Sequence, residues 1–306
     1  MVKSGVADFE KSIKDILDSL KLSGADLDSY AAHYTSSNVP VILLKDKDSN
    51  KIRQYSGDYV NDPSEGRYLI DVKISAAQKS EHPEKGAFVE TLSDLRTSRL
   101  LFSAYKRATF FSCWTLTKVT DKNRAVCDSL NHWRFYGEDG KGASIMVPAS
   151  HLSAIFNNEV FKVVYGTEPR GGGSVANVRP VKLFMDALVK VLNSLGKTKN
   201  KAKSEFEEVL KASHPLLFLF KSSEYNAEKE VRTIIHTNGY SEKCGVHFDD
   251  RNPQRAYVDG GSGLLSNEAI VFFGPKSDTK WAIHTMGLAS DRELVIDVFV
   301  STKPYR

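Results

Sequence analysis

The sequence Ala31-Ala32-His33-Tyr34-Thr35-Ser36-Ser37 places an imidazole, a phenol and aliphatic hydroxyls just ahead of the apolar run Val39 to Leu44. A strand that carries a His and a Thr and leads into the body of a domain can hold a planar amide ligand, because its His side chain and its backbone both form hydrogen bonds. His33-Tyr34-Thr35 alone is a pattern that chance produces often. Its interpretation therefore depends on the acidic and aromatic residues that follow.

Length and composition are those of an ordinary globular protein. The chain has 306 residues, of which 41% are hydrophobic and 26% charged, so it can bury a sizeable core as one large domain or two small ones. The net charge of +4 is a small excess, whereas nucleic-acid binding usually requires a concentrated basic face. Nucleic acid is therefore not expected as a partner.

The three cysteines, Cys113, Cys127 and Cys244, are too few and too scattered for a disulfide framework or a zinc site. We expect small buried hydrophobic cysteines in a reducing compartment, and no metal. No apolar run is long enough to span a membrane, and the N-terminus has no hydrophobic signal region. The expected location is the cytoplasm, or a host cell cytosol reached by secretion without a Sec signal.

Helices and strands are mixed along the chain without regular strand–helix–strand alternation, which favours an α+β fold with a largely antiparallel sheet. Residues 1–30, with an amphipathic helix over 5–22, are expected to form an N-terminal helical extension, and residues 31–306 a single domain. Further helices are expected over 91–106, 123–135, 149–156, 177–211 with a break at Gly196, and 278–286. Strands are expected over 67–74, 108–117, 142–148, 161–165, 230–236, 269–273 and 294–301.

The sequence Glu228-Lys229-Glu230-Val231-Arg232 is the strongest local signal of chemistry. Residues two apart in a strand point to one face, so Glu228, Glu230 and Arg232 would share a face if all three lie in the strand. Two neighbouring carboxylates shift each other's pKa and can divide the work of a reaction, one stabilising a developing cation and the other orienting a nucleophile. The alternative interpretation is a structural salt bridge with Arg232 on an edge strand.

Aromatic and hydroxyl side chains supply the remaining candidates. Trp133 and Tyr136 are three residues apart near a predicted helix end, so they would lie on one face and could clamp a flat ring by stacking. Ser112 lies in a predicted strand rich in Phe, Trp and Thr, from which a hydroxyl could reach a ribose or an amide. The alternatives are core packing for the two aromatic residues and an ordinary strand hydroxyl for Ser112.

Seven segments, taken in order, resemble a widespread family of bacterial domains long catalogued as of unknown function, which is in turn similar to ADP-ribosyltransferases. The resemblance extends from about residue 31 to the C-terminus. The segments are His33-Tyr34-Thr35, Asn61-Asp62-Pro63-Ser64-Glu65-Gly66, Phe111-Ser112, Trp133-Arg134-x-Tyr136-Gly137, Glu228-x-Glu230-x-Arg232, Gly274-Pro275 and Ser301-x-x-Pro304-Tyr305-Arg306.

The resemblance implies an ADP-ribosyltransferase-like split, mostly antiparallel β-core with NAD in its cleft. It implies that His33 on the first strand and Glu230 on a late strand are catalytic, with Glu228 beside Glu230 as in toxins that modify protein side chains. The middle position stays open between Ser112, which matches a toxin-like pattern, and Tyr136, which matches an aromatic one. The residues that would bind NAD are His33, Tyr34, Thr35, Ser112, Trp133, Tyr136 and Arg232.

The activity implied by the resemblance is NAD-dependent mono-ADP-ribosylation of a protein side chain by a bacterial effector or toxin. Size, the N-terminal helix and the motif order are similar to the CteC type of effector, which modifies a threonine of ubiquitin, so ubiquitin is one candidate acceptor. The alternatives are an NAD glycohydrolase, a defence toxin that modifies nucleic acid, and a binding module without catalysis.

Overall fold

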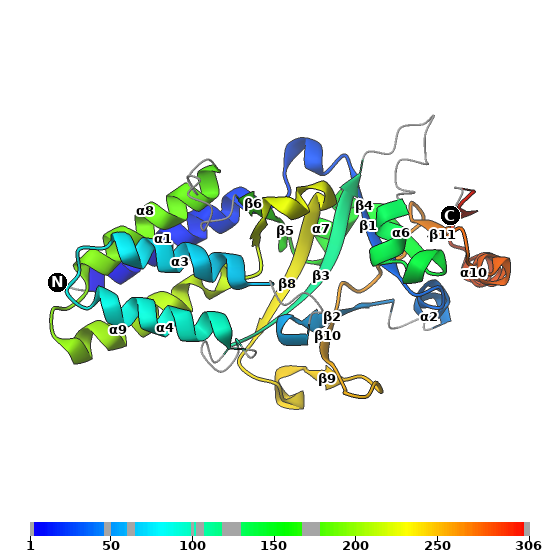
Figure 1. Ribbon diagram of the computed structural model, residues 1–306. Coiled ribbons are helices and arrows are strands. Elements are labelled where there is room, and N and C mark those ends of the chain that lie inside the picture. The colour runs from blue at the N-terminus through cyan, green and yellow to red at the C-terminus, as the bar shows by residue number, and fades with distance from the viewer. Residues whose placement is uncertain are drawn as a thin grey trace.

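The computed structural model describes residues 3–45, 50–59, 65–98, 101, 107–117, 130–166 and 178–302. A bundle of helices forms one end of the elongated molecule, and a sheet with further helices forms the rest (Figure 1). The sheet is mostly antiparallel, which confirms the α+β class. No described helix has both the length and the apolar character needed to cross a membrane.

The sheet is organised around β3 (Ala108–Thr117), whose aromatic and β-branched residues favour an extended backbone. Its main strand order is β12-β11-β4-β1-β3-β2-β10-β9, while β8 pairs with β3 and β5 pairs with β8. Among the described strands of this sheet, β11 and β12 alone pair in parallel. The other strands are β1 (Tyr30–Thr35), β2 (Ile52–Ser56), β4 (Ala143–Pro148), β5 (Val160–Lys162), β8 (Glu230–Thr237), β9 (His247–Phe248), β10 (Ala256–Gly260), β11 (Ile270–Phe273) and β12 (Asp297–Val300).

One edge of β3 is shared by two strands, whereas the other edge belongs to β8. On the shared edge, β1 pairs with residues 115–117 and β2 pairs with residues 110–111. On the opposite edge, β8 pairs continuously with residues 108–115. Among the described strands, none pairs with residues 112–114 on the shared edge, so β1 and β2 diverge beside the middle of β3.

The helix bundle consists of α1 (Lys3–Leu20), α3 (Arg67–Lys79), α4 (Lys85–Thr97), α8 (Arg179–Ser194) and α9 (Lys199–Ser213). On α1, apolar side chains recur at helical spacing and are buried in the same core as those of α3, α8 and α9. The buried residues of α1 are Phe9, Ile13, Ile16 and Leu20. The N-terminal helix therefore packs as a member of this bundle.

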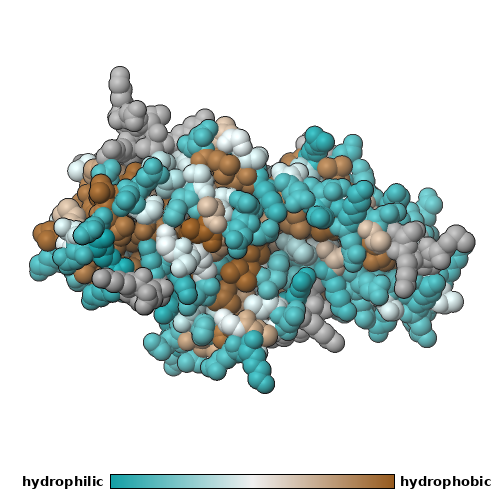
Figure 2. Space-filling view, turned by 180° about the vertical axis from the view of Figure 1, so that it is seen from behind, coloured by the Kyte–Doolittle hydropathy of each residue, from teal (hydrophilic) through white to brown (hydrophobic). Residues whose placement is uncertain are grey.

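A second core lies on the other side of the sheet, under α2 (Val39–Lys45), α7 (Ala149–Ile155) and α10 (Thr279–Asp291). Two short elements complete the region around the site, the helix α6 (Leu130–Phe135) and the parallel pair formed by β6 (Val164–Gly166) and β7 (Phe220–Ser222). Seen from behind, the end formed by α2 and α10 carries hydrophobic surface (Figure 2). Its exposed apolar side chains are Ile42, Ile283 and Met286.

Several predicted elements differ from the structure. The strand predicted over 67–74 is wrong, because this segment is the start of α3. Its buried residues Leu69, Val72 and Ala76 recur three and four apart, which is the spacing of a helix face. The helix predicted over 91–106 begins earlier, as α4, and ends at Thr97. Of the helix predicted over 123–135, the described part is α6, and the rest lies outside the described residues.

Candidate functional site

The acidic pair is held at the start of β8 by a break in the backbone between its two members. Glu228 ends the short 3₁₀ segment η8 (Ser223–Glu228), and Lys229 adopts a left-handed conformation with φ of 46°. Glu230 is the first residue of β8, so Glu228 lies outside the strand and the three residues Glu228, Glu230 and Arg232 do not share one strand face. Arg232 does share a face with Glu230 and pairs with it, its Nε lying 2.7 Å from Oε1 and its Nη2 3.1 Å from Oε2.

Lys221 on β7 brings the two carboxylates together instead. Its Nζ donates to Oε2 of Glu228 at 3.0 Å and to Oε2 of Glu230 at 3.1 Å. The same Nζ lies 3.7 Å from Oε2 of Glu65, which precedes α3. We call Glu65, Lys221, Glu228, Glu230 and Arg232 the charged cluster.

Arg232 is the most enclosed member of the charged cluster, with 1% of its surface exposed. Its Nη1 donates to Oε1 of Glu65 and to the carbonyl oxygen of Phe218, both at 2.6 Å. The guanidinium also lies over the ring of Phe111, 4.4 Å from its centroid. The buried cation is therefore paired with two carboxylates and hydrogen-bonded, which is the condition for tolerating a charge in the interior.

The two cations keep Glu230 ionised although it is only 6% exposed. Burial alone would raise the pKa of Glu230, but Arg232 and then Lys221 outweigh it and hold that pKa well below its ordinary value. Burial alone would lower the pKa of Lys221, but Glu230 and Glu65 outweigh it and raise that pKa. Both groups are therefore charged at neutral pH.

His33 lies at the point where β1 and β2 diverge. Its Nδ1 is 2.8 Å from the carbonyl oxygen of Cys113, and its ring is beside that of Trp114, with centroids 5.1 Å apart. A carbonyl only accepts hydrogen bonds, so Nδ1 carries the proton and Nε2 of the neutral ring is an acceptor. Burial lowers the pKa of His33 despite the bond to Cys113, which favours this neutral form.

Cys113 connects His33 to Glu230. While its carbonyl accepts from His33, its thiol interacts with the Glu230 carboxylate. Part of the residue is exposed to solvent, yet the pKa of its thiol is raised well above the ordinary value, first by desolvation of the thiol and then by Glu230. In register, Ala32, Thr115 and Glu230 lie opposite one another on three adjacent strands, so the next residue, His33, is about two strand spacings, roughly 10 Å, from Glu230. Because neighbouring strand residues alternate, the His33 side chain leaves the sheet on the face of Trp114, opposite to the face of Glu230.

The predicted aromatic clamp is only partly in place. Tyr136 is 49% exposed and donates a hydrogen bond to Glu228, and burial together with Glu228 raises the pKa of its phenol. Trp133 is 0% exposed and packs edge-on against Tyr34. Its ring belongs to the core, as the packing alternative stated, so the structure contradicts the assignment of Trp133 to a ligand surface. Tyr34 also stacks on His132, with centroids 5.1 Å apart.

The two candidates for the middle position are separated by the sheet. Ser112 is buried, accepts a hydrogen bond from Nε1 of Trp114 at 2.8 Å and lies 2.6 Å from the hydroxyl of Thr233. Neighbouring strand residues point to opposite faces, so Ser112 faces away from Cys113 and Glu230. Of the two, only Tyr136 reaches the charged cluster, while Ser112 behaves as a strand hydroxyl. Thr35, at the end of β1, is half-buried.

Four residues of the site have no assignment from sequence. Glu65 lies in the segment Asn61 to Gly66 that carries part of the resemblance, and Asn61 to Ser64 are outside the described residues. Lys221 follows an apolar run and gives no signal of its own. The phenol of Tyr165 accepts a hydrogen bond from the backbone N–H of Glu230 at 2.9 Å. Cys113 was expected to be a buried hydrophobic residue, and this prediction is wrong, because the residue is exposed.

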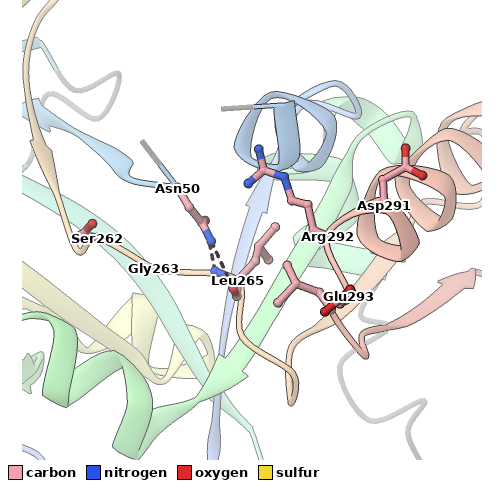
Figure 3. A pocket seen from close by; sticks show the side chains of 8 residues that line it. Asn50, Ser262, Gly263, Leu265, Asp291, Arg292 and Glu293 are labelled. Carbon is pink, nitrogen blue, oxygen red and sulfur yellow. Dashed lines mark hydrogen bonds between the residues drawn. The ribbon is translucent and has the colours of Figure 1, made fainter. Parts of the chain in front are cut away.

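A cavity of about 560 Å³ lies elsewhere, between the glycine-rich turn after β10 and the end of α10 (Figure 3). The side-chain amide of Asn50, at its wall, donates to the carbonyl oxygen of Leu265 and accepts from the backbone N–H of Leu265. No member of the charged cluster lines this cavity. It is lined by Asn50, Ser262, Gly263, Leu265, Asp291, Arg292, Glu293 and Leu294.

The described residues contain no group of His, Cys, Asp and Glu side chains that could hold a metal ion. The charged cluster supplies carboxylates and two cations, and the phenol of Tyr136 contacts it through Glu228. No protein-family model matches the sequence, and no curated protein or solved structure matches it either.

Proposed function

We propose that the chain is an NAD-dependent mono-ADP-ribosyltransferase that modifies a protein side chain. The observation that carries the proposal is the double contact at Cys113, whose carbonyl accepts from His33 and whose thiol interacts with Glu230. The residues proposed for the two ends of the site come from positions almost 200 residues apart in sequence, yet both contact this one residue of β3. Their side chains leave the sheet on opposite faces, so the proposed site would span the gap between β1 and β2 beside Cys113.

In the proposed reaction the bond between nicotinamide and its ribose breaks, nicotinamide leaves with the bonding electrons, and an acceptor oxygen forms the new bond to the ribose. Positive charge develops on the ribose, and a preorganised carboxylate stabilises such charge strongly. Glu230 is assigned this role because it is ionised and fixed by Arg232. Glu228 is assigned to take the proton of the acceptor hydroxyl, being the less buried carboxylate of the two.

The oxygens of Glu230 already accept three N–H bonds, two from Arg232 and one from Lys221. A carboxylate has about four lone-pair positions, and the Cys113 thiol, a weak donor, takes the remaining one. A ribose hydroxyl is a better donor than a thiol. It can therefore replace Cys113 at Glu230 without breaking either ion pair.

His33 is assigned to hold a ribose hydroxyl through Nε2, because its Nδ1 is committed to Cys113. The backbone of Tyr34 or Thr35 is assigned to the carboxamide of nicotinamide, and the half-exposed ring of Tyr136 to stacking on nicotinamide. The divergence of β1 and β2 along one edge of β3 supports these assignments, since a split core is what the resemblance to ADP-ribosyltransferases implies.

The acceptor is proposed to be a protein hydroxyl, with a threonine of ubiquitin as the first candidate to test. A second candidate function is favoured by one observation, the near-complete burial and full pairing of Glu230. A carboxylate in that state is also what a structural ion cluster of a non-catalytic binding module would contain.

Incubation with labelled NAD, with and without a cell lysate and purified ubiquitin, tests the proposal. Label on a protein band is the expected result, whereas free ADP-ribose alone indicates a glycohydrolase and labelled nucleic acid a nucleic-acid modifier. Glu230→Gln should keep the fold and remove turnover, and Glu159→Gln, at the surface pair with Lys21, is the matched control. Near-normal NAD consumption by the Glu230 variant would overturn the assignment.

A further inference from the structure

Lys221 is the one residue of the charged cluster whose side chain contacts both Glu228 and Glu230. Arg232, the other cation, pairs with Glu230 and Glu65. The two oxygens that bind Lys221 are within about 6 Å of each other, because each lies within hydrogen-bond distance of one nitrogen. Without a cation between them, two carboxylates at that separation repel and tend to share a proton.

We propose that Lys221 is a positioning residue, whose ammonium group keeps Glu228 and Glu230 ionised at the same time and fixes their separation. The inference deepens the proposed function and rests on it for the roles of the two carboxylates. In that reaction one carboxylate must remain charged beside the ribose while the other accepts a proton. Proton sharing between them would remove one of the two roles.

The placement of Lys221 explains how it can set this geometry. It lies on β7, which pairs with β6, and directly opposite Tyr165 in that pair. Tyr165 accepts from the backbone N–H of Glu230, while Lys221 donates to the Glu230 side chain. The β6–β7 pair therefore holds Glu230 at its main chain and its carboxylate.

The Lys221 side chain is itself confined. It is buried, and its ammonium lies 4.9 Å from the centroid of the Tyr225 ring. Tyr225 belongs to η8, the segment that ends at Glu228. The position of the ammonium is therefore fixed by the same segment that carries one of the two carboxylates.

The test is a carboxyl titration of the folded protein by ¹³C NMR with labelled glutamate side chains. In Lys221→Met, which retains an unbranched apolar side chain but no charge, at least one carboxyl of the cluster should titrate about one pH unit or more above its wild-type position. Lys221→Arg should restore the wild-type titration. Lys162 on the neighbouring strand β5 forms a partly exposed pair with Asp26, and Lys162→Met should leave the carboxyl titration of the cluster unchanged.

A double variant separates charge from packing. Lys221→Met/Glu228→Gln lacks the repulsion that Lys221 is proposed to offset, so the Glu230 carboxyl should return toward its wild-type titration. If Lys221→Met fails to fold, the double variant should fold. Failure of the double variant to fold, or an unchanged titration in a folded Lys221→Met, would overturn the inference.

Turnover provides a second, separable readout. If the wild type consumes NAD, the acidic limb of its pH profile should move to higher pH in Lys221→Met and return in Lys221→Arg. If the wild type consumes no NAD, the proposed function fails. The NMR titration then still decides whether Lys221 keeps both carboxylates ionised.

Discussion

Arg232 Nη1 lies 2.6 Å from Glu65 Oε1, and this ion pair joins the strand β8 to the segment that leads into α3. Both side chains are almost completely buried. The pair therefore fixes the sheet to the helix bundle at the position where the charged cluster is assembled.

Removing the cation of this pair should be costly. Arg232→Met leaves Glu65 and Glu230 with one cation instead of two, and breaking a buried pair typically lowers the free energy of unfolding by about 3–5 kcal/mol. Urea denaturation measures the loss. Lys276→Met removes the cation of a pair with Asp139 in which both side chains are exposed, 37% and 65%, and should cost less than about 1 kcal/mol. Equal losses of unfolding free energy in the two variants would show that burial of the ion pair does not determine its contribution to stability.

The neutral tautomer of His33 leads to a prediction about NAD binding. His33→Ala removes the acceptor Nε2, and the loss of one such hydrogen bond should raise the Kd for NAD about tenfold, measured by calorimetry. Because burial lowers the pKa of His33, acidification should weaken binding in the wild type only well below the ordinary imidazole pKa of about 6.5, where a protonated ring no longer accepts at Nε2. His284→Ala, at an exposed position of α10, is the control and should bind NAD normally.

The raised thiol pKa of Cys113 predicts slow alkylation despite its exposure. The thiolate is the reactive form, so at pH 7.5 Cys113 should react with iodoacetamide at least about tenfold more slowly than glutathione. A mass-spectrometric time course measures the rate. Glu230→Gln removes one of the groups that raise this pKa and should accelerate the reaction. A thiol that reacts as fast as glutathione would contradict the described electrostatics.

Lys73 of α3 is buried, and desolvation lowers its pKa to about 7. The unfolded chain binds a proton at this lysine from about pH 10.4 downward, whereas the folded protein does so only near pH 7. The free energy of unfolding should therefore rise between pH 7 and 10, by at most about 4 kcal/mol, relative to Lys73→Met. Thermal or urea denaturation across this range measures the difference. Lys79→Met, at an exposed position of the same helix, should show no such difference. A difference between wild type and Lys73→Met that does not change from pH 7 to 10 would contradict the lowered pKa of Lys73.

Strand β3 was predictable from end to end, because its aromatic and β-branched residues favour an extended backbone regardless of their partners. The start of α3 was not, since Arg67 to Ile74 contains few strong helix signals and the burial that decides its helical face comes from α4 and the distant α8. The N-terminal helix was predictable as a helix, but its role in a bundle depends on helices far along the chain.

The candidate site divides in the same way. The proximity of Glu230 and Arg232 follows from strand alternation alone, and the structure confirms it. The proximity of Glu228 does not follow from alternation, because the left-handed Lys229 places Glu228 outside the strand. Glu228 lies near Glu230 because both carboxylates contact the ammonium of Lys221. Glu65 and Lys221 enter through contacts between distant segments, for which one sequence contains no signal.

The packing of α1 has a consequence for synthesis on the ribosome. Its partners α8 and α9 begin roughly 160 and 180 residues after α1 ends, so the amphipathic helix has no native surface to cover when it first emerges. At roughly 5–20 residues per second, that interval is about 10–40 s. During it the apolar face of α1 is open to chaperones. Truncated nascent chains that stop before α8 should therefore bind them more strongly than chains that extend past α9.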